Sequence, residues 1–205
     1  MDNAVAFVQA YLRVNGYFTV SEYPIVEALG PDQYRTATDL DILAFRFPHA
    51  GRLVPGSPGA SKAVERFEPA PELGCPINMA DMIIGEVKEG VAEFNRSGQR
   101  RPVLEAALSR FGCCPTQETS RIVDELLRTG TAISEAGHQV RLVAFGSRKG
   151  SPTHHRFQQI MLEHVIRFLQ SYLRDHWELL RHADFKDPAL GFLATTEKAL
   201  RVSTL

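Results

Sequence analysis

The chain has 205 residues, of which 44% are hydrophobic and 23% charged, and its formal net charge is −1. This composition predicts a folded globular protein of one domain with elaborations, and the charge excludes a globally basic surface for nucleic acid. The three cysteines fit neither a disulfide framework nor a zinc spacing, and the N-terminus lacks a signal-peptide pattern, so we expect a cytoplasmic protein. No apolar run reaches the roughly 18 residues of a membrane span, so we expect no membrane partner.

The first part of the chain predicts one helix followed by two strands. Apolar residues at helical spacing predict a helix over residues 3–14, which Asn15-Gly16 ends. A run rich in β-branched and aromatic residues predicts a strand over 17–26, and Gly30-Pro31-Asp32 predicts a turn. A second strand is expected over 41–47.

Residues 48–78 hold six of the twelve prolines and four glycines. This stretch therefore predicts a long loop or flap with little regular structure, inserted into the domain. The apolar run 82–87 then predicts a third strand.

Two helices, over 102–111 and 116–128, are expected next, followed by strands over 131–134 and 139–145. The same order occurs in a winged helix. We favour the next helix and strand of the main domain, because the predicted helix 116–128 carries three acidic residues against two arginines.

The apolar spacing from 155 to 182 predicts a single helix of about seven turns, roughly 40 Å long. We expect this helix to belong to a C-terminal helical extension, 148–205, that packs on a core formed by 1–147. Its long apolar stripe would also suit a homodimer contact.

Charge is unevenly distributed along the chain. Residues 1–41 hold six acidic residues against two arginines, and residues 141–174 hold six basic residues against Glu163. An acidic segment suited to a metal ion and a basic one suited to phosphate would then lie in one protein, although chance surface variation gives the same pattern.

Acidic residues in two predicted strands indicate the chemistry. Asp41 heads one apolar strand, and Glu86-Val87-Lys88 ends the next, where strand alternation puts Glu86 and Lys88 on one face. Burying these charges is costly unless they have a partner, and Mg²⁺ (or Mn²⁺) prefers carboxylate ligands. Asp39, two residues before Asp41, is a competing candidate.

An acidic-x-Lys triplet is a weak motif by itself. A second copy, Asp184-x-Lys186, lies in a polar segment where we expect no chemistry. The alternative for Glu86 and Lys88 is an inert salt bridge at the end of a strand.

Asp41 on one strand and Glu86-Val87-Lys88 on the next, after a helix and a first strand, resemble the PD-(D/E)xK restriction-endonuclease-like nuclease superfamily. The resemblance covers residues 1–147. It implies an α/β fold with an α-β-β-β-α-β core, a mixed central sheet flanked by helices, and Mg²⁺-dependent cleavage of nucleic acid, DNA in our expectation. It further implies Asp41, Glu86 and the Val87 carbonyl as metal ligands and Lys88 as the lysine that assists the attacking water.

The same resemblance suggests an additional acidic ligand from the N-terminal region, for which Glu22 is the candidate. Phosphate contacts are expected from basic residues in and near the basic segment, namely Arg100, Arg101, Arg148, Lys149 and Arg156.

The chain departs from the family pattern in two places: Leu40 replaces the proline before the first acid, and some 30 residues separate the second and third strands. Two other functions therefore stay open. One is a catalytically inactive nuclease-fold protein that binds nucleic acid or a protein, and the other is a metal-dependent hydrolase of a small phosphoester.

Overall fold

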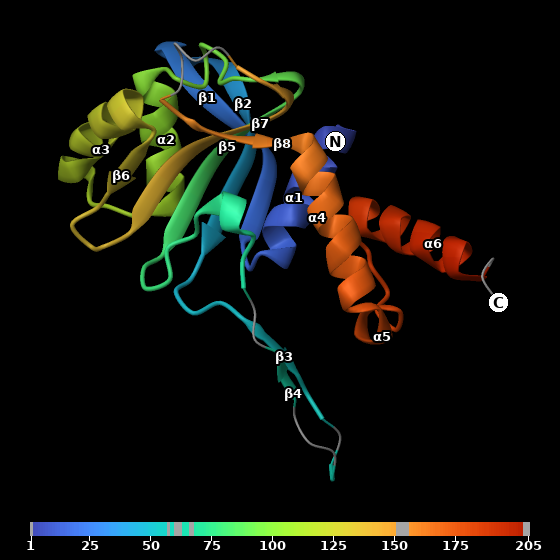
Figure 1. Ribbon diagram of the computed structural model, residues 1–205. Coiled ribbons are helices and arrows are strands. Elements are labelled where there is room, and N and C mark those ends of the chain that lie inside the picture. Colours follow the sequence, from blue (N-terminus) through green and yellow to red (C-terminus); the bar gives the residue numbers. More distant parts are fainter. Residues whose placement is uncertain (1, 57, 60–62, 66–67, 151–155, 203–205) are drawn as a thin grey trace.

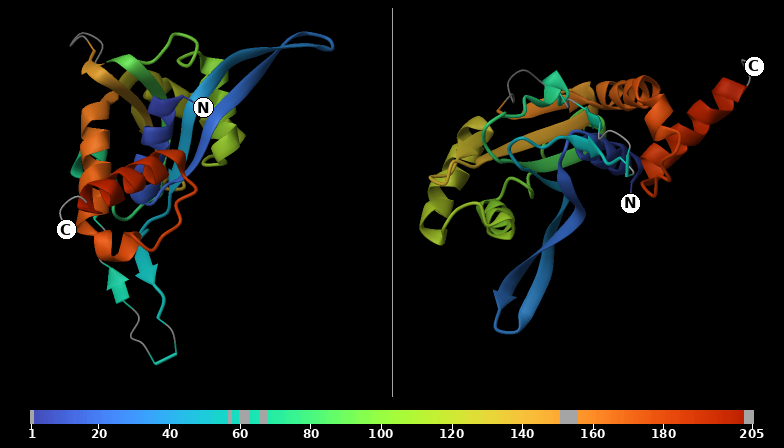
Figure 2. Two further views of the ribbon diagram at one scale, coloured as in Figure 1. Left: turned by 90° about the vertical axis from the view of Figure 1, so that its right-hand side faces the viewer. Right: turned by 90° about the horizontal axis from the view of Figure 1, so that it is seen from below.

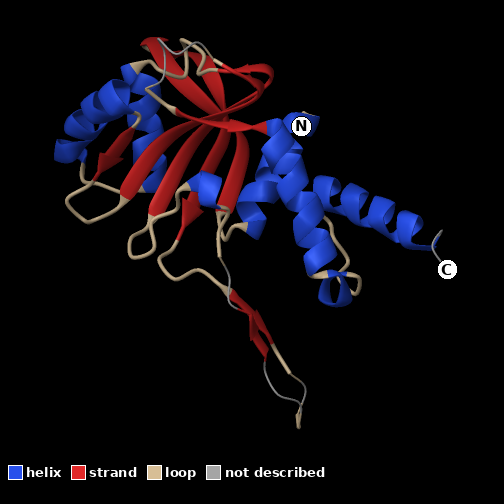
Figure 3. Ribbon diagram, in the orientation of Figure 1, coloured by secondary structure: helices blue, strands red, loops and turns tan. Residues whose placement is uncertain are grey.

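The computed structural model describes residues 2–56, 58–59, 63–65, 68–150 and 156–202. A six-stranded mixed sheet lies between two layers of helices (Figures 1 and 3). In chain order the elements are α1 (Asn3–Val14), β1 (Phe18–Gly30), β2 (Gln33–Arg46), β3 (Arg52–Val54), β4 (Ala63–Glu65), the 3-10 helix η1 (Pro71–Leu73), β5 (Asp81–Ala92), α2 (Arg101–Phe111), α3 (Thr116–Thr129), β6 (Thr131–Ile133), β7 (Gln139–Lys149), β8 (Gln158–Met161), α4 (Leu162–Asp175), α5 (Trp177–Leu180) and α6 (Pro188–Val202).

The sheet order is β1-β2-β5-β7-β6. β8 also pairs with β7, further along that strand than β6 does. The β1–β2 and β2–β5 pairs are antiparallel, whereas β5 and β7 are parallel and are joined through α2 and α3. Parallel neighbours need such a crossover connection. The strand β5 therefore occupies the centre of the sheet with a different kind of neighbour on each side.

Alternation along the strands divides the core between the two faces of the sheet. Ile83 and Val143 pack with α1, α4 and α6 on one face, and Ile84 and Leu142 pack with α2 and α3 on the other. Figure 1 shows these two groups of helices on opposite sides of the strands.

Two hairpins project from this body. β2 pairs with β5 only from Ile42 to Arg46, so most of the β1–β2 hairpin continues past the sheet as a two-stranded arm (Figure 2). β3 and β4 form a second, short hairpin that projects from another side of the body.

The predicted helices near 3–14, 102–111 and 116–128 are confirmed within one residue at either end. The strands exist where they were expected, but β1, β2, β5 and β7 are longer than predicted. Glu86 and Lys88 therefore lie within β5 and not at its end, because β5 continues to Ala92 along β7. β7 is an inner strand of the main sheet, which favours the main-domain interpretation of this region over a winged helix.

The prediction of one helix over 155–182 is wrong. Residues 158–161 form β8 along the edge of β7, α4 begins at Leu162, and the helix breaks at His176. Ile160 packs on the face of α1 and α4, while Phe157 and Met161 pack on the opposite face. Strand alternation gives this distribution, and the edge of β7 gains hydrogen-bond partners that a helix could not supply.

Other expectations also change in detail. The Pro/Gly-rich stretch 48–78 contains β3, β4 and η1, and its residues 57, 60–62 and 66–67 lie outside the described residues, as do 151–155. The boundary expected after residue 147 falls within β7, and β8 beyond it joins the sheet. Among the described residues, no helix combines the length and apolarity that crossing a bilayer requires.

A buried ion pair links β5 to β7. The Arg141 guanidinium donates to both carboxylate oxygens of Asp81, at 2.9 Å from Nε, and also to the Leu73 carbonyl and Gln158 Oε1, both at 2.6 Å. The hydroxyl of Tyr17 donates to the same carboxylate. Asp81 is 0% exposed and Arg141 4% exposed, so each charge depends on the other for its solvation.

We predict that Arg141→Met lowers the free energy of unfolding by about 3–5 kcal/mol, because it leaves the Asp81 carboxylate buried without its counter-ion. Urea denaturation at pH 7 measures the change. The double variant Asp81→Leu/Arg141→Met should recover most of the loss, since it buries no charge. A loss below about 1 kcal/mol in the single variant would contradict this account.

Candidate metal centre

Asp41 lies where β2 separates from β5. The last residue pair of these two strands is Ile42 with Gly85, so Asp41 and Glu86 occupy the next opposing positions. Here the Asp41 side chain replaces the backbone as acceptor: its Oδ2 accepts a 2.7 Å hydrogen bond from the Val87 N–H. The carboxylate is thereby fixed beside the backbone of the Glu86-Val87-Lys88 segment.

Glu86 is the more buried of the two carboxylates, at 4% exposure. Its Oε1 accepts a 2.8 Å hydrogen bond from Asn95 Nδ2. Its Oε2 is buried and has no hydrogen-bond partner among the described residues. A buried acceptor without a partner costs about 1–3 kcal/mol, and more when it is charged. This oxygen therefore needs a partner that the described residues do not supply, such as a proton, a water or a cation.

Lys88 is half-buried and lies on the same side of β5 as Glu86. Its Nζ is 3.9 Å from Glu86 Oε1, and its side chain keeps 37% exposure. This distance is at the outer limit of an ion pair and involves the oxygen that Asn95 already holds. A salt bridge with Lys88 therefore leaves the buried Oε2 unexplained.

Both carboxyl groups bind protons more strongly than usual. Burial, followed by the charge of Asp41, raises the pKa of Glu86 to about 7, against the lowering effect of Lys88 and Asn95. Burial also raises the pKa of Asp41, although the Val87 N–H and Lys88 oppose the shift. Two close carboxylates disfavour each other's ionisation, and a shared cation removes this conflict.

Glu22 lies on β1 opposite Asp41, because Ser21 pairs with Ile42 and Tyr23 with Leu40. Its backbone has φ of +53°, a left-handed conformation that is uncommon for a residue other than glycine. The side chain is exposed, and its charge helps to raise the pKa of Asp41, as does Asp2 at the start of α1. Asp39, the competing candidate, is also exposed.

The donor set is compatible with a hard divalent cation. Mg²⁺ is commonly held by one or two carboxylates together with waters and substrate phosphate oxygens. Asp41 and Glu86 provide two carboxylates, and Oε2 of Glu86 has no hydrogen-bond partner among the described residues. Within the described ranges, however, no three His, Cys, Asp or Glu side chains are grouped to hold a metal. A cation here would therefore depend on non-protein ligands as well.

The predicted phosphate-binding residues lie in three places. Arg100 and Arg101 lie at the start of α2 and already have acidic partners, Glu27 at 2.7 Å and Asp124 respectively. Arg148 and Lys149 are exposed at the end of β7, where they pair with Val91 and Ala92 of β5. Arg156 precedes β8, is exposed, and donates to the Leu127 carbonyl at 3.2 Å.

Sequence reasoning missed Asn95, which orients Glu86. The loop after β5 folds back towards Glu86, and the Asn95 side chain accepts a hydrogen bond from the Gly98 N–H within this loop. Gly98 lies close to the carboxylate, since a Cβ there would be 3.5 Å from Glu86 Oε2. The segment Asn95-Arg96-Ser97-Gly98 has the composition of a turn directly after the strand, and this signal was available in the sequence. The second triplet, Asp184-x-Lys186, is an exposed 2.6 Å ion pair.

Comparison of the chain with protein-family models, with curated proteins and with solved structures finds no match. The interpretation of the site therefore depends on its own geometry.

We predict that Glu86→Gln stabilises the metal-free protein at pH 8. Folding raises the pKa of Glu86 from 4.5 to about 7, so the folded state gains a proton in this window and the free energy of unfolding falls as pH rises through it. Removing the charge should add up to about 3 kcal/mol at pH 8 and little at pH 4.5. Urea denaturation in EDTA across this range measures both values.

Glu89→Gln, an exposed change on the same strand, is the matched control and should have little effect at either pH. An equal gain for Glu86→Gln at pH 4.5 and pH 8 would mean that shape, and not charge, causes the stabilisation.

Proposed function

We propose that this protein is a Mg²⁺-dependent nuclease that hydrolyses phosphodiester bonds in DNA at Asp41, Glu86 and Lys88. The observation that carries the proposal is the Glu86 carboxylate, which is buried opposite Asp41 with one oxygen lacking a hydrogen-bond partner among the described residues. Glu118 also has one buried oxygen without a partner among the described residues, but its other oxygen is paired closely with Arg121, whereas the nearest cation to Glu86 is Lys88 at 3.9 Å. A cation-binding role explains both the burial and the unpaired oxygen.

The order of the elements supports a PD-(D/E)xK restriction-endonuclease-like assignment as part of this proposal. The order α1, β1, β2, β5, α2 and α3, then β7 accommodates the α-β-β-β-α-β core of that superfamily. β2 and β5 are neighbours, so the strand carrying Asp41 and the strand carrying Glu86 and Lys88 lie side by side, as the resemblance requires.

Each residue of the site has a role that its position supports. Asp41 and Glu86 would hold the cation, with the Val87 carbonyl and Glu22 as additional candidates. When bound, Mg²⁺ would supply positive charge against the negative charge that develops on the phosphate. Lys88 keeps its ammonium group partly exposed beside Glu86, where it can orient the attacking water and stabilise the transition state.

The exposed Arg148 and Lys149 at the end of β7 are suited to backbone phosphates. Phosphate contacts position a nucleic acid without reading its sequence. Arg100 and Arg101 are less available for this task, because nucleic acid would have to displace Glu27 and Asp124 from them.

We predict that Lys88→Ala lowers the rate of Mg²⁺-dependent DNA cleavage at least about 100-fold, because it removes a positive charge from the transition state. The measurement is single-turnover cleavage of a linear duplex and of a single strand by the purified chain. Lys186→Ala is the matched control, since Lys186 belongs to the exposed second triplet, and it should cleave like the wild type.

Equal rates for Lys88→Ala and the wild type would remove Lys88 from the mechanism. Wild-type protein that binds DNA without cleaving it in Mg²⁺ or Mn²⁺ would favour an inactive binding module of the same fold.

Calorimetric titration tests the metal site directly. We predict saturable binding of Mg²⁺ and Mn²⁺ by the wild type, with release of a proton near pH 7, because the cation displaces the proton that Glu86 holds. Asp41→Ala and Glu86→Ala should each abolish the binding, and Asp184→Ala should leave it unchanged. Absence of saturable binding in the wild type would indicate that the site is a protonated carboxyl pair instead.

A further inference from the structure

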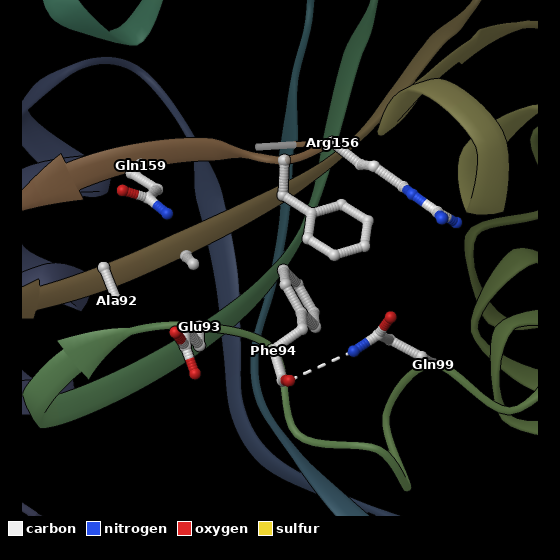
Figure 4. A pocket seen from close by; sticks show the side chains of 8 residues that line it. Ala92, Glu93, Phe94, Gln99, Arg156 and Gln159 are labelled. Atoms are coloured by element: carbon white, nitrogen blue, oxygen red, sulfur yellow. Dashed lines mark hydrogen bonds between the residues drawn. The ribbon is translucent and has the colours of Figure 1, made fainter. Parts of the chain in front are cut away.

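A cavity of about 270 Å³ lies on the α2 and α3 side of the sheet, beside the candidate metal centre. Its walls come from the end of β5 and the loop after it, from Ala144 on β7, and from β8 and the two residues before it (Figure 4). Glu93 and Arg156 are exposed, whereas Phe94 is buried. The cavity thus has charged residues at its outer side and an aromatic interior.

The cavity and Glu86 share a wall. Ala144, which lines the cavity, pairs with Glu86 in the parallel β5–β7 ladder. Neighbouring strands lie about 4.8 Å apart, and opposing residues of a parallel pair share a face of the sheet. The loop that carries Phe94 and Gln99 also carries Asn95, which donates to Glu86 Oε1. A ligand group in the cavity would therefore lie next to whatever Glu86 binds.

The interior presents two aromatic rings. The centroids of Phe94 and Phe157 are 5.1 Å apart, with their planes inclined at 58°. Aromatic side chains in this position favour a flat, unsaturated ring system, because stacking on an aromatic face stabilises a nucleobase by about 1–3 kcal/mol.

Two glutamine amides add polar groups of opposite kind. The Gln99 nitrogen donates to the carbonyls of Phe94 and Asn95, at 3.1 and 3.3 Å (Figure 4). The amide oxygen of Gln99 is then the group that can accept a hydrogen bond from a ligand. The Gln159 oxygen accepts from the Gly150 N–H at 3.2 Å, so its nitrogen is the donor. One donor and one acceptor beside aromatic rings match the mixed hydrogen-bonding edge of a nucleobase.

The volume of the cavity limits the size of the ligand that it can hold. Pockets for drug-sized ligands measure about 300–1,000 Å³. A cavity of about 270 Å³ suits one ring system better than a peptide or a whole dinucleotide. Arg156 is exposed and lies at this cavity; its Nη1 donates to the Leu127 carbonyl, and its other N–H groups can meet a phosphate attached to the bound base.

We propose that this cavity binds one unpaired nucleobase of the strand whose phosphate lies at Glu86 and Lys88. The inference rests on the proposed nuclease function and gives it a substrate class: single-stranded DNA, or duplex DNA from which one nucleotide is turned out of the stack. Turning out a paired base costs a few kcal/mol, so unpaired and mismatched sites are preferred.

The test compares two fluorescein-labelled ten-nucleotide single strands in EDTA, one with all its bases and one with abasic residues at every position. Both carry the same phosphates. We expect the wild type to bind the strand with bases about tenfold more tightly by fluorescence anisotropy, as the stacking of one base predicts. Phe157→Leu should remove this difference without changing the affinity for the abasic strand, and Phe157→Tyr should retain it.

Phe192→Leu, an exposed aromatic change on α6, is the control and should leave the difference intact. Equal affinity of the wild type for the two strands would overturn the proposal, as would equal losses on both strands in Phe157→Leu. Binding of deoxyadenosine monophosphate alone as tightly as the strand would overturn it too, because the cavity would then serve a free nucleotide.

This binding assay contains no divalent cation, so its result is independent of cleavage. Base-dependent binding without Mg²⁺-dependent cleavage would leave the cavity assignment standing and remove the nuclease proposal. Cleavage without base-dependent binding would do the reverse.

Discussion

The Arg141 guanidinium holds several parts of this fold together at one point. It bonds Asp81 on β5, the Leu73 carbonyl in the η1 segment and Gln158 on β8, while Tyr17 after α1 donates to the same Asp81 carboxylate. These groups lie far apart in the sequence and meet only when the layers are assembled. Since a buried charge without its partner costs several kcal/mol, the pair disfavours any arrangement that separates β5 from β7.

Two carboxylates of β5, one at its start and one at its middle, differ in a way that indicates function. Asp81, at the start of the strand, is fully buried and has its carboxylate oxygens satisfied by Arg141 and Tyr17. Glu86, five residues later and almost equally buried, keeps one oxygen without a partner among the described residues and faces Asp41. The same strand therefore contains one carboxylate whose oxygens are satisfied within the fold and another with an oxygen free to bind a cation or a proton.

The pattern of the candidate centre was readable in part from the sequence. Period-two alternation is enough to place Glu86 and Lys88 on one side of β5, and an acidic residue in an apolar strand indicates Asp41. The hydrogen bond from the Val87 N–H to Asp41 and the role of Asn95 were not predictable, because they depend on where β2 separates from β5 and on how the following loop folds back. The aromatic cavity likewise joins Phe94 to Phe157, residues remote in sequence.

The helices α1, α2 and α3 could be located from the amino-acid sequence, because their apolar residues recur at helical spacing and Asn15, Gly112 and Gly130 end them. The conformation of the segment around Ile160 depends on its neighbours in the folded protein, because its few apolar residues are compatible with a helix and with a strand. The unpaired edge of β7 selects the strand, since β8 satisfies its backbone groups and distributes Ile160 and Met161 to opposite faces of the sheet. Helical spacing alone therefore does not establish a helix where a neighbouring strand edge can pair with the same residues.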